Sequence, residues 1–384
     1  MGVYLDFNST APIDERVLEE MIKIYRNTPG NADSRTHTFG DDARRVVETA
    51  RAEVASLLGV NKDEVFFTSG ATESNNIAIQ GLREYAEKTR KKHIITTSVE
   101  HKSVLGTCKA LEQQGFEVSY VNPKADGRVS VEEVTELVRE DTVLVSIMHV
   151  NNETGIIQPI KEIGEFLADK ETFFHIDATQ SFGKLVDELK AIKYDMLSMS
   201  AHKIAGPQGV GTLVLRKKRY KLPPVKGIMY GGQQERGIRP GTIPVALVVG
   251  LGTACALVAS EYKQNQEKCL TIKNALLEEL NASGVKCEIN GDQNYCVPST
   301  LNICFNGVSS EALMLSTKQY CGISNGSACN SKSYEPSYVL TAMGIPTEKI
   351  ENSVRISWGA ESDCEDVVTS FKELLAVAKS FAAF

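Results

Sequence analysis

Short apolar runs alternate with amphipathic stretches over the first two thirds of the chain. The runs have the length of β-strands and lie at residues 65–67, 93–97, 117–121, 143–148 and 173–176. Helices are expected between them, from about Ala71 and His101 and over residues 131–138 and 160–167. Alternation at this spacing predicts an α/β fold with a mostly parallel central sheet and helices on both of its faces.

The pattern changes after two further predicted strands at residues 196–200 and 210–215. A turn-rich segment covers residues 222–241, and a long helix is predicted from about residue 243 to residue 280. Beyond that helix we expect strands at 286–289, 300–305 and 353–357 and helices at 310–317 and 363–378. The chain is therefore expected to form a large domain of residues 13–245 and a smaller α+β domain of residues 1–12 plus 246–384.

Residues 240–260 carry no charged side chain, and this stretch is nearly long enough to cross a membrane. It contains prolines and glycines, however, and leads into a charged helical pattern at residues 261–279. We therefore predict a buried helix between the domains. The first residues also lack the basic and apolar segments of a signal peptide. A cytoplasmic protein without a membrane partner is expected.

Charge and cysteine content exclude several classes of function. The 384 residues include 42 Lys and Arg against 49 Asp and Glu, a formal net charge of −7, which argues against direct binding of nucleic acid. The nine cysteines are an odd number, with no CxxC pair and no Cys/His cluster at zinc spacing. Neither a disulfide framework nor a metal site is expected.

Polar turns follow five of the predicted strands, at the sheet edge where α/β proteins bind ligands. They contain Ser69 to Glu73, Glu100 and His101, Asn151 to Glu153, Asp177 to Gln180, and Ser200 to Lys203. Each turn alone is weak evidence for a ligand site, because a turn of small residues usually has no ligand and an Asp after a strand usually caps a helix. Together, a Lys, an Asp, a His and a turn suited to phosphate match the requirements of pyridoxal phosphate.

Long motifs extend this pattern over most of the chain. They are YLDFNSTAPID, FTSGATESNNIAI, VEHKSVL, SIMHVNNETG, HIDATQS, SMSAHKIAGPQGVG, GGQQERGIRPGT, GISNGSACNS and SVRISWG, in this order. The chain resembles the NifS/IscS-type cysteine desulfurases, which are fold-type I pyridoxal-phosphate enzymes. VNNETGIIQP, GGQQERGIRPGT and NGDQNYCVP look closer to the desulfurases of DNA phosphorothioation systems.

The resemblance implies roles for individual cofactor-binding residues. Lys203 corresponds to the lysine that forms the Schiff base, Asp177 to the partner of the pyridine nitrogen, and Gln180 to the group bonded to the ring's phenolic oxygen. His101 corresponds to an acid/base stacked on the ring, although alone it would be taken for a helix-start or core histidine. The phosphate contacts correspond to Ala71, Thr72, Ser200 and His202, and to Thr242 donated by a neighbouring subunit, so a homodimer is expected.

Asn152 and Arg355 correspond to the pair that holds the substrate carboxylate. An Arg fork can bond a carboxylate bidentately. An Arg in a late strand is otherwise more often a surface residue.

Cys329 distinguishes a desulfurase from other enzymes of this fold. It lies in SNGSACNS, where bulky side chains are rare, and this composition predicts a mobile loop at residues 321–333. The resemblance implies that the Cys329 thiolate takes sulfur from L-cysteine, leaving alanine and an enzyme persulfide. Most other cysteines lie in apolar patterns, and the neighbouring Cys321 is also interpreted as structural.

The expected function is that of a pyridoxal-phosphate-dependent cysteine desulfurase that passes sulfur to an acceptor protein. The acceptor could serve DNA phosphorothioation, iron–sulfur cluster assembly or tRNA thiolation. Two alternatives stay open: an aminotransferase or selenocysteine/cysteine lyase that does not use Cys329, and a docking subunit of a sulfur-relay complex without activity of its own.

Overall fold

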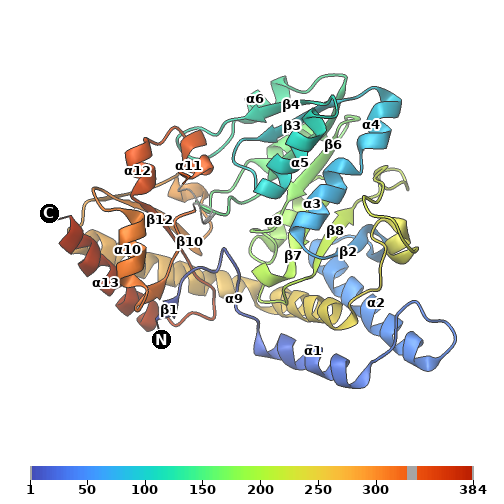
Figure 1. Ribbon diagram of the computed structural model, residues 1–384, viewed down its shortest axis with the longest axis horizontal. Helices are drawn as coiled ribbons and strands as arrows, with labels where there is room; N and C mark the ends of the chain where they lie inside the picture. Colours follow the sequence, from blue (N-terminus) through green and yellow to red (C-terminus); the bar gives the residue numbers. More distant parts are fainter. Residues whose placement is uncertain (1, 327–334, 383–384) are drawn as a thin grey trace.

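A large and a small sheet lie next to each other, and one long helix runs along both (Figure 1). The structure is a computed structural model that describes residues 2–326 and 335–382. The long helix is α9 (Val245–Ser283).

The large sheet has seven strands and confirms the mostly parallel α/β fold expected from the sequence. β4, β3, β5, β6 and β7 run parallel to one another, and β8 runs antiparallel to both of its neighbours, β7 and β2. In spatial order the strands are β2 (Val65–Thr68), β8 (Gly211–Leu215), β7 (Met196–Ser200), β6 (Phe173–Asp177), β5 (Thr142–Met148), β3 (His93–Thr97) and β4 (Glu117–Val121).

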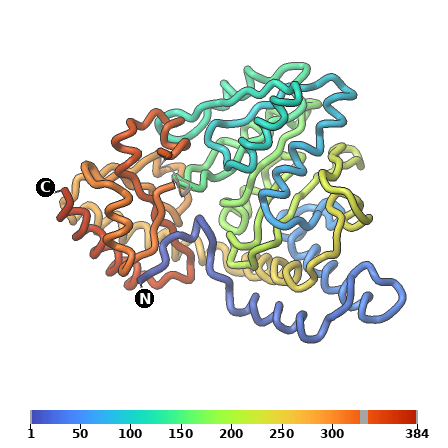
Figure 2. The backbone as a smooth tube through the Cα atoms, in the orientation of Figure 1, coloured from blue at the N-terminus to red at the C-terminus, as the bar shows by residue number. Residues whose placement is uncertain are grey.

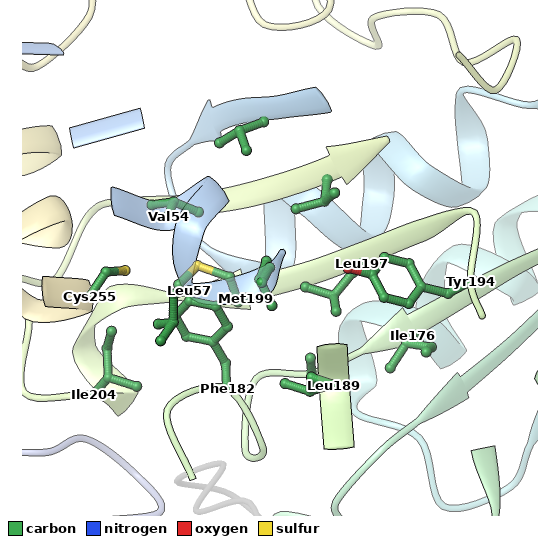
Figure 3. Close-up of a cluster of buried hydrophobic side chains, with 14 of the residues drawn as sticks. Val54, Leu57, Ile176, Phe182, Leu189, Tyr194, Leu197, Met199, Ile204 and Cys255 are labelled. Carbon is green, nitrogen blue, oxygen red and sulfur yellow. The ribbon is translucent and has the colours of Figure 1, made fainter. Parts of the chain in front are cut away.

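Consecutive apolar residues of these strands point to opposite faces of the sheet, which is why the strands are continuous apolar runs. Phe66 and Leu144 pack against the helices of one face, whereas Phe67 and Val145 join the core on the other. The first face carries α3 (Ala71–Gln80), α4 (Arg83–Thr89) and α5 (Lys102–Glu112), and the second carries α2 (Thr38–Leu58), α6 (Val131–Glu136), α7 (Ile160–Leu167) and α8 (Val186–Ala191). Figure 3 shows part of the second core, where Phe182, Leu57 and Met199 lie together.

The small sheet is antiparallel and has its own core. β10 (Thr300–Phe305) lies between β9 (Cys287–Ile289) and β12 (Ser353–Ser357). The helices α10 (Ser310–Thr317) and α13 (Cys364–Phe381) pack there, and α11 (Tyr338–Ala342) and α12 (Thr347–Glu351) form a further small core with Val99, which follows β3. The N-terminal strand β1 (Val3–Tyr4) pairs with β11 (Cys321–Gly322), so the chain begins beside its C-terminal third (Figure 2).

Helix α9 contributes to both cores. Val248, Leu251 and Cys255 pack into the core of the large sheet, where α1 (Glu15–Asn27) and α2 lie against the helix, whereas Ile272 and Leu276 pack into the small core. Within the described residues, α9 is the one helix that is long and apolar enough to cross a membrane, on length and composition alone. Its packing in two protein cores agrees with the buried helix expected from the sequence.

The two cores support a division of the chain into two domains. We propose the boundaries given above, with residues 13–245 as the large domain and residues 1–12 plus 246–384 as the small one. Helix α9 then joins the domains, since its first turns belong to the core of the large sheet and its later turns to the core of the small sheet.

Candidate active site

A cavity of about 680 Å³ opens where the strands of the large sheet end. Its walls come from the turns after β2, β3, β5, β6 and β7, from the N-terminal segment and from β12 of the small sheet. The residues that line it are Asn8, Ser9, Thr10, Ser69, Gly70, Ala71, Thr72, Glu73, His101, Met148, Val150, Asn152, Asp177, Thr179, Gln180, Ser200, His202, Lys203, Gln208, Gly209 and Arg355.

Lys203 is the amine of the cavity. It ends the short 3₁₀ helix η2 (Ala201–Lys203) directly after β7, and its Nζ donates to the backbone oxygens of Asn8 and Ser9, both at 2.5 Å. Burial lowers the pKa of Lys203 to about 7, and the positive charges of Arg355 and Lys184 add to the effect. A large fraction of the amine is therefore neutral, and nucleophilic, near neutral pH.

Asp177 is a buried carboxylate at the end of β6. Its Oδ1 accepts from the backbone N–H of Thr179 at 3.0 Å and from the Thr179 hydroxyl at 2.5 Å. Its Oδ2 accepts from Asn75 Nδ2 at 2.8 Å. These bonds satisfy the charged form of the carboxylate and hold it at the wall of the cavity.

His101 lies at the cavity as the N-cap of α5. Its Nδ1 accepts from the backbone N–H of Ser103 at 3.2 Å, and the Ser103 hydroxyl lies 2.8 Å from the same atom. Burial lowers the pKa of His101, which favours the neutral imidazole.

One end of the cavity is suited to a phosphate. Helix α3 begins at Ala71 after Gly70, whose φ of 149° favours glycine, and the first backbone N–H groups of a helix attract anions. Ser200 closes this end, and His202 Nδ1 lies 3.0 Å from Thr10 Oγ1. Burial lowers the pKa of His202 to about 4, so the ring is a neutral hydrogen-bonding group.

Arg355 enters the cavity from the small sheet. Its Nη1 donates to the backbone oxygen of Asn152 at 3.0 Å, and its Nη2 forms an ion pair with Asp6 Oδ1 at 2.5 Å. The side chain of Arg355 is 7% exposed, so the guanidinium is held in place and offers few directions of approach.

Several buried polar atoms at the cavity have no hydrogen-bond partner within the described chain. They include Gln180 Oε1, Asn152 Oδ1 and Arg355 Nε. Buried polar atoms without a partner are rare and costly in a folded protein. Their presence beside a free amine, a carboxylate and a helix N-terminus fits a polar ligand with a phosphate, a ring nitrogen and a carbonyl. The residues present therefore fit pyridoxal phosphate.

The structure brings the predicted site residues together with two exceptions. Lys203, Asp177, His101, Gln180, Asn152, Ala71, Thr72, Ser200, His202 and Arg355 all line the one cavity. Thr242 is exposed and does not line it. Cys329 lies outside the described residues.

The part played by the N-terminal segment was not predicted from the sequence. Asn8 is buried, and its backbone oxygen accepts from both Lys203 Nζ and Gln180 Nε2. Asp6 pairs with Arg355. Both residues stand in the motif YLDFNSTAPID, which was a signal of the resemblance, but nothing in their local spacing places them beside residues hundreds of positions away.

Comparisons with known proteins show which sequences and folds this chain is similar to. The sequence model of the family described as Aminotransferase class-V matches residues 3–369. Cysteine desulfurase IscS of Vibrio vulnificus (strain YJ016) is 43% identical over 387 residues, 99% of this chain and 93% of that protein. A solved NifS-like protein is 38% identical with a TM-score of 0.90, over 99% of this chain and 100% of its own. DndA from Streptomyces lividans is 44% identical with a TM-score of 0.81, over 93% of this chain and 99% of its own.

Proposed function

Because the chain belongs to the aminotransferase class-V family, as a pyridoxal-phosphate-dependent cysteine desulfurase of the IscS and NifS type, we propose that Cys329 receives the sulfur of L-cysteine bound in the cavity. The observation that carries the assignment of the site is the convergence of Lys203, Asp177, His101 and Arg355 on one cavity. Beyond the desulfurase activity, we propose roles for individual residues and Cys329 as the destination of the sulfur.

The residues of this chain divide the work of binding and proton transfer. With pyridoxal phosphate bound, Ala71, Thr72, Ser200 and His202 would hold its phosphate, Gln180 would hydrogen-bond its phenolic oxygen, and Asp177 would pair with its ring nitrogen. When bound, the cofactor supplies an electron sink for the charge left at the substrate α carbon. Arg355 and Asn152 bind the substrate carboxylate and thereby orient the α C–H bond toward Lys203 Nζ, which removes its proton.

The sulfur step conserves atoms and electrons without an added oxidant. The Cys329 thiolate forms an S–S bond to the substrate sulfur, and the substrate's Cβ–S bond breaks. The electron pair of that bond goes to Cβ, which takes up a proton to give the methyl group of alanine. The sulfur is oxidised to the persulfide level while Cβ is reduced. His101 is the group we assign to handling the proton of the substrate thiol.

The assembly, location and acceptor are also part of the proposal. We propose a homodimer in which Thr242 of one chain reaches the phosphate site of the other, acting in the cytoplasm and passing its persulfide sulfur to an acceptor protein. Overall identity does not choose the pathway, because IscS and DndA are 43% and 44% identical to this chain. The phrases VNNETGIIQP and NGDQNYCVP favour an acceptor in DNA phosphorothioation.

The test compares Cys329→Ser with Cys364→Ser, a substitution of a partly exposed cysteine at the start of α13. We expect Cys329→Ser to bind the cofactor and show its visible absorbance but to form no alanine from L-cysteine and to gain no sulfur by protein mass spectrometry. Cys364→Ser should behave as the native enzyme. Lys203→Ala should lose the native visible absorbance.

Other outcomes would point to the alternatives. Normal alanine formation by Cys329→Ser would contradict the proposal and favour a lyase, and activity that requires a 2-oxo acid would favour an aminotransferase. A protein that stays colourless with added cofactor would favour a docking subunit. A pull-down with persulfidated Cys329, followed by tracing the sulfur, identifies the acceptor.

A further inference from the structure

A chain of buried hydrogen bonds joins Asp177 to His101 behind the wall of the cavity. Asn75 Nδ2 lies 2.8 Å from Asp177 Oδ2 and 2.9 Å from Ser103 Oγ, and Ser103 Oγ lies 2.8 Å from His101 Nδ1. Asn75 is fully buried and Ser103 is 8% exposed. Neither residue lines the cavity, yet together they connect the two groups expected to meet the cofactor ring from different sides.

The direction of each bond follows from the carboxylate outward. A carboxylate only accepts, so the amide nitrogen of Asn75, and not its oxygen, faces Asp177. The second proton of that nitrogen points to Ser103 Oγ, so the single hydroxyl proton of Ser103 is available to donate to His101 Nδ1. The backbone N–H of Ser103 also donates to Nδ1, at 3.2 Å. Two independent donors therefore meet this ring nitrogen.

We propose that Asn75 and Ser103 are positioning residues that hold His101 in the neutral form with its proton on Nε2. Protonation of Nδ1 would turn an acceptor into a donor and break both bonds from Ser103. His101 therefore presents an N–H donor from Nε2 toward whatever occupies the cavity. This inference rests on the proposed function, in which His101 handles a proton beside the cofactor.

The unpartnered oxygen of Asn75 supports a special role for the amide. Asn75 Oδ1 is buried and has no hydrogen-bond partner within the described chain. A buried acceptor without a partner costs stability, so the local fold does not by itself explain an Asn here. The two donors on Nδ2, placed between a carboxylate and a hydroxyl, do explain it.

The charges around His101 also affect the protonation of its ring. Burial lowers the pKa of the ring, Asp177 of β6 raises it, and Lys203 of η2 and Lys102 of α5 lower it. The buried carboxyl of Glu100 precedes His101 in the chain, and burial holds it protonated. The bonds from Ser103 add a directional effect, because they decide which ring nitrogen carries the proton.

The experiment reads the ring nitrogens directly, in the full-length enzyme loaded with its cofactor and labelled with ¹⁵N-histidine. His101→Gln identifies the signals of His101 among the six histidines. We expect Nε2 to be protonated and Nδ1 to be unprotonated in the native enzyme. Ser103→Ala should give a mixture of tautomers and raise the pH of ring titration by about half to one unit, the loss of one hydrogen bond.

Kinetics and a conservative variant complete the test. Ser103→Ala should move the acid limb of the pH profile of kcat to higher pH, with little change in KM. Ser103→Thr keeps the hydroxyl and should restore the native profile. A proton on Nδ1 in the native enzyme would overturn the inference even if a variant failed to fold, as would an unchanged tautomer in Ser103→Ala. Alanine formation by Cys329→Ser would contradict the proposed function and leave the tautomer result unaffected.

Discussion

At the scale of single residues, burial adjusts the acid–base properties of the groups around the cavity. Burial lowers the pKa of Lys203 to about 7 and that of Lys184 to about 8, and it raises the pKa of Glu100 to about 8. Each shift disfavours the charged form, as expected for groups removed from water. Near neutral pH the site therefore contains an amine of which a large fraction is neutral.

Removing the charge of Lys184 should raise the pKa of Lys203. The substitution Lys184→Met keeps the length of the side chain, and the activity that depends on neutral Lys203 should then require a higher pH. We expect the acid limb of the kcat profile for alanine formation to move to higher pH by less than about one unit, because the Lys203 amine is free only after substrate has bound. Lys190→Met, on the surface of α8, is the matched control. A shift of the acid limb to lower pH in Lys184→Met would contradict the electrostatic explanation.

Glu100 should make the protein less stable as the pH rises. It is fully buried, its Oε1 accepts from Thr97 Oγ1 at 2.7 Å and from the Met148 N–H at 2.9 Å, and its Oε2 has no partner within the described chain. Because its folded-state pKa is about 8 and its unfolded pKa is about 4.3, the folded state binds more protons between these values. The free energy of unfolding therefore falls as the pH rises through this window.

The substitution Glu100→Gln tests this linkage. It keeps the acceptor for Thr97 and Met148 and removes the titration, so the stability of the variant relative to the native protein should increase from about pH 5 to pH 8, by up to about 1.4 kcal/mol per unit. Urea unfolding at several pH values measures the difference. Glu133→Gln, at the surface of α6, controls for the loss of one carboxylate. A difference that is constant with pH would count against a protonated Glu100.

At the scale of elements, one buried ion pair fixes the segment before α9 to the large sheet. Glu235 accepts from Nη1 and Nη2 of Arg51 of α2, at 2.8 and 2.7 Å, and from the Phe67 N–H of β2 at 2.8 Å. The two side chains are 11% and 3% exposed. Glu235 has a φ of 46°, so its backbone is held in a conformation that non-glycine residues rarely adopt.

Removing Glu235 should destabilise the protein strongly, because the buried Arg51 guanidinium loses its buried partner and keeps only the more exposed carboxylate of Glu48. We expect Glu235→Ala to lower the free energy of unfolding by about 3–5 kcal/mol, measured by chemical denaturation. Asp42→Ala removes an exposed ion pair with Arg45 on the same helix and should cost less than about 1 kcal/mol. Equal effects of the two substitutions would show that burial of the pair does not matter.

At the scale of the whole molecule, the N-terminal segment connects the small sheet to the cavity. Asn8 Nδ2 donates to Thr300 Oγ1 of β10 at 3.0 Å and to the Asn152 backbone oxygen at 3.2 Å. Its backbone N–H donates to Ser357 Oγ of β12 at 3.0 Å. Since its backbone oxygen also accepts from Lys203, this residue joins both sheets at the active site.

Loss of the Asn8 side chain should affect stability and substrate binding together. Asn8→Ala leaves Thr300 Oγ1 without the donor from Asn8 and leaves Arg355 Nη1 as the donor to the Asn152 oxygen, and we expect a loss of about 1–3 kcal/mol in the free energy of unfolding. The KM for L-cysteine should rise, because Arg355 approaches Asn152 at the same place. Asn294→Ala, at the surface, is the control. If Asn8→Ala is destabilised but keeps its KM, the contacts of Asn8 stabilise the fold without affecting substrate binding, contrary to this prediction.

The sequence predicted much of the fold because the large sheet is built from local signals. The predicted strand at 93–97 coincides with β3, and the predicted helix at 310–317 with α10. The antiparallel direction of β8 and the pairing of β1 with β11 were not predicted, since both depend on contacts between distant segments. Asn75 stood in a motif of the resemblance, but its bonds to Asp177 and Ser103 were not foreseen for the same reason.

By itself the sequence determined the chemistry available to this protein: an amine, a carboxylate, an imidazole and an anion-binding turn, each after an apolar strand. Their order along the chain implied that they share a sheet edge, because the ends of parallel strands meet there. Only the tertiary structure decided which atoms face each other and which charges lose water. Hydrogen-bond direction and desolvation depend on neighbours brought close by folding, and no local pattern encodes them.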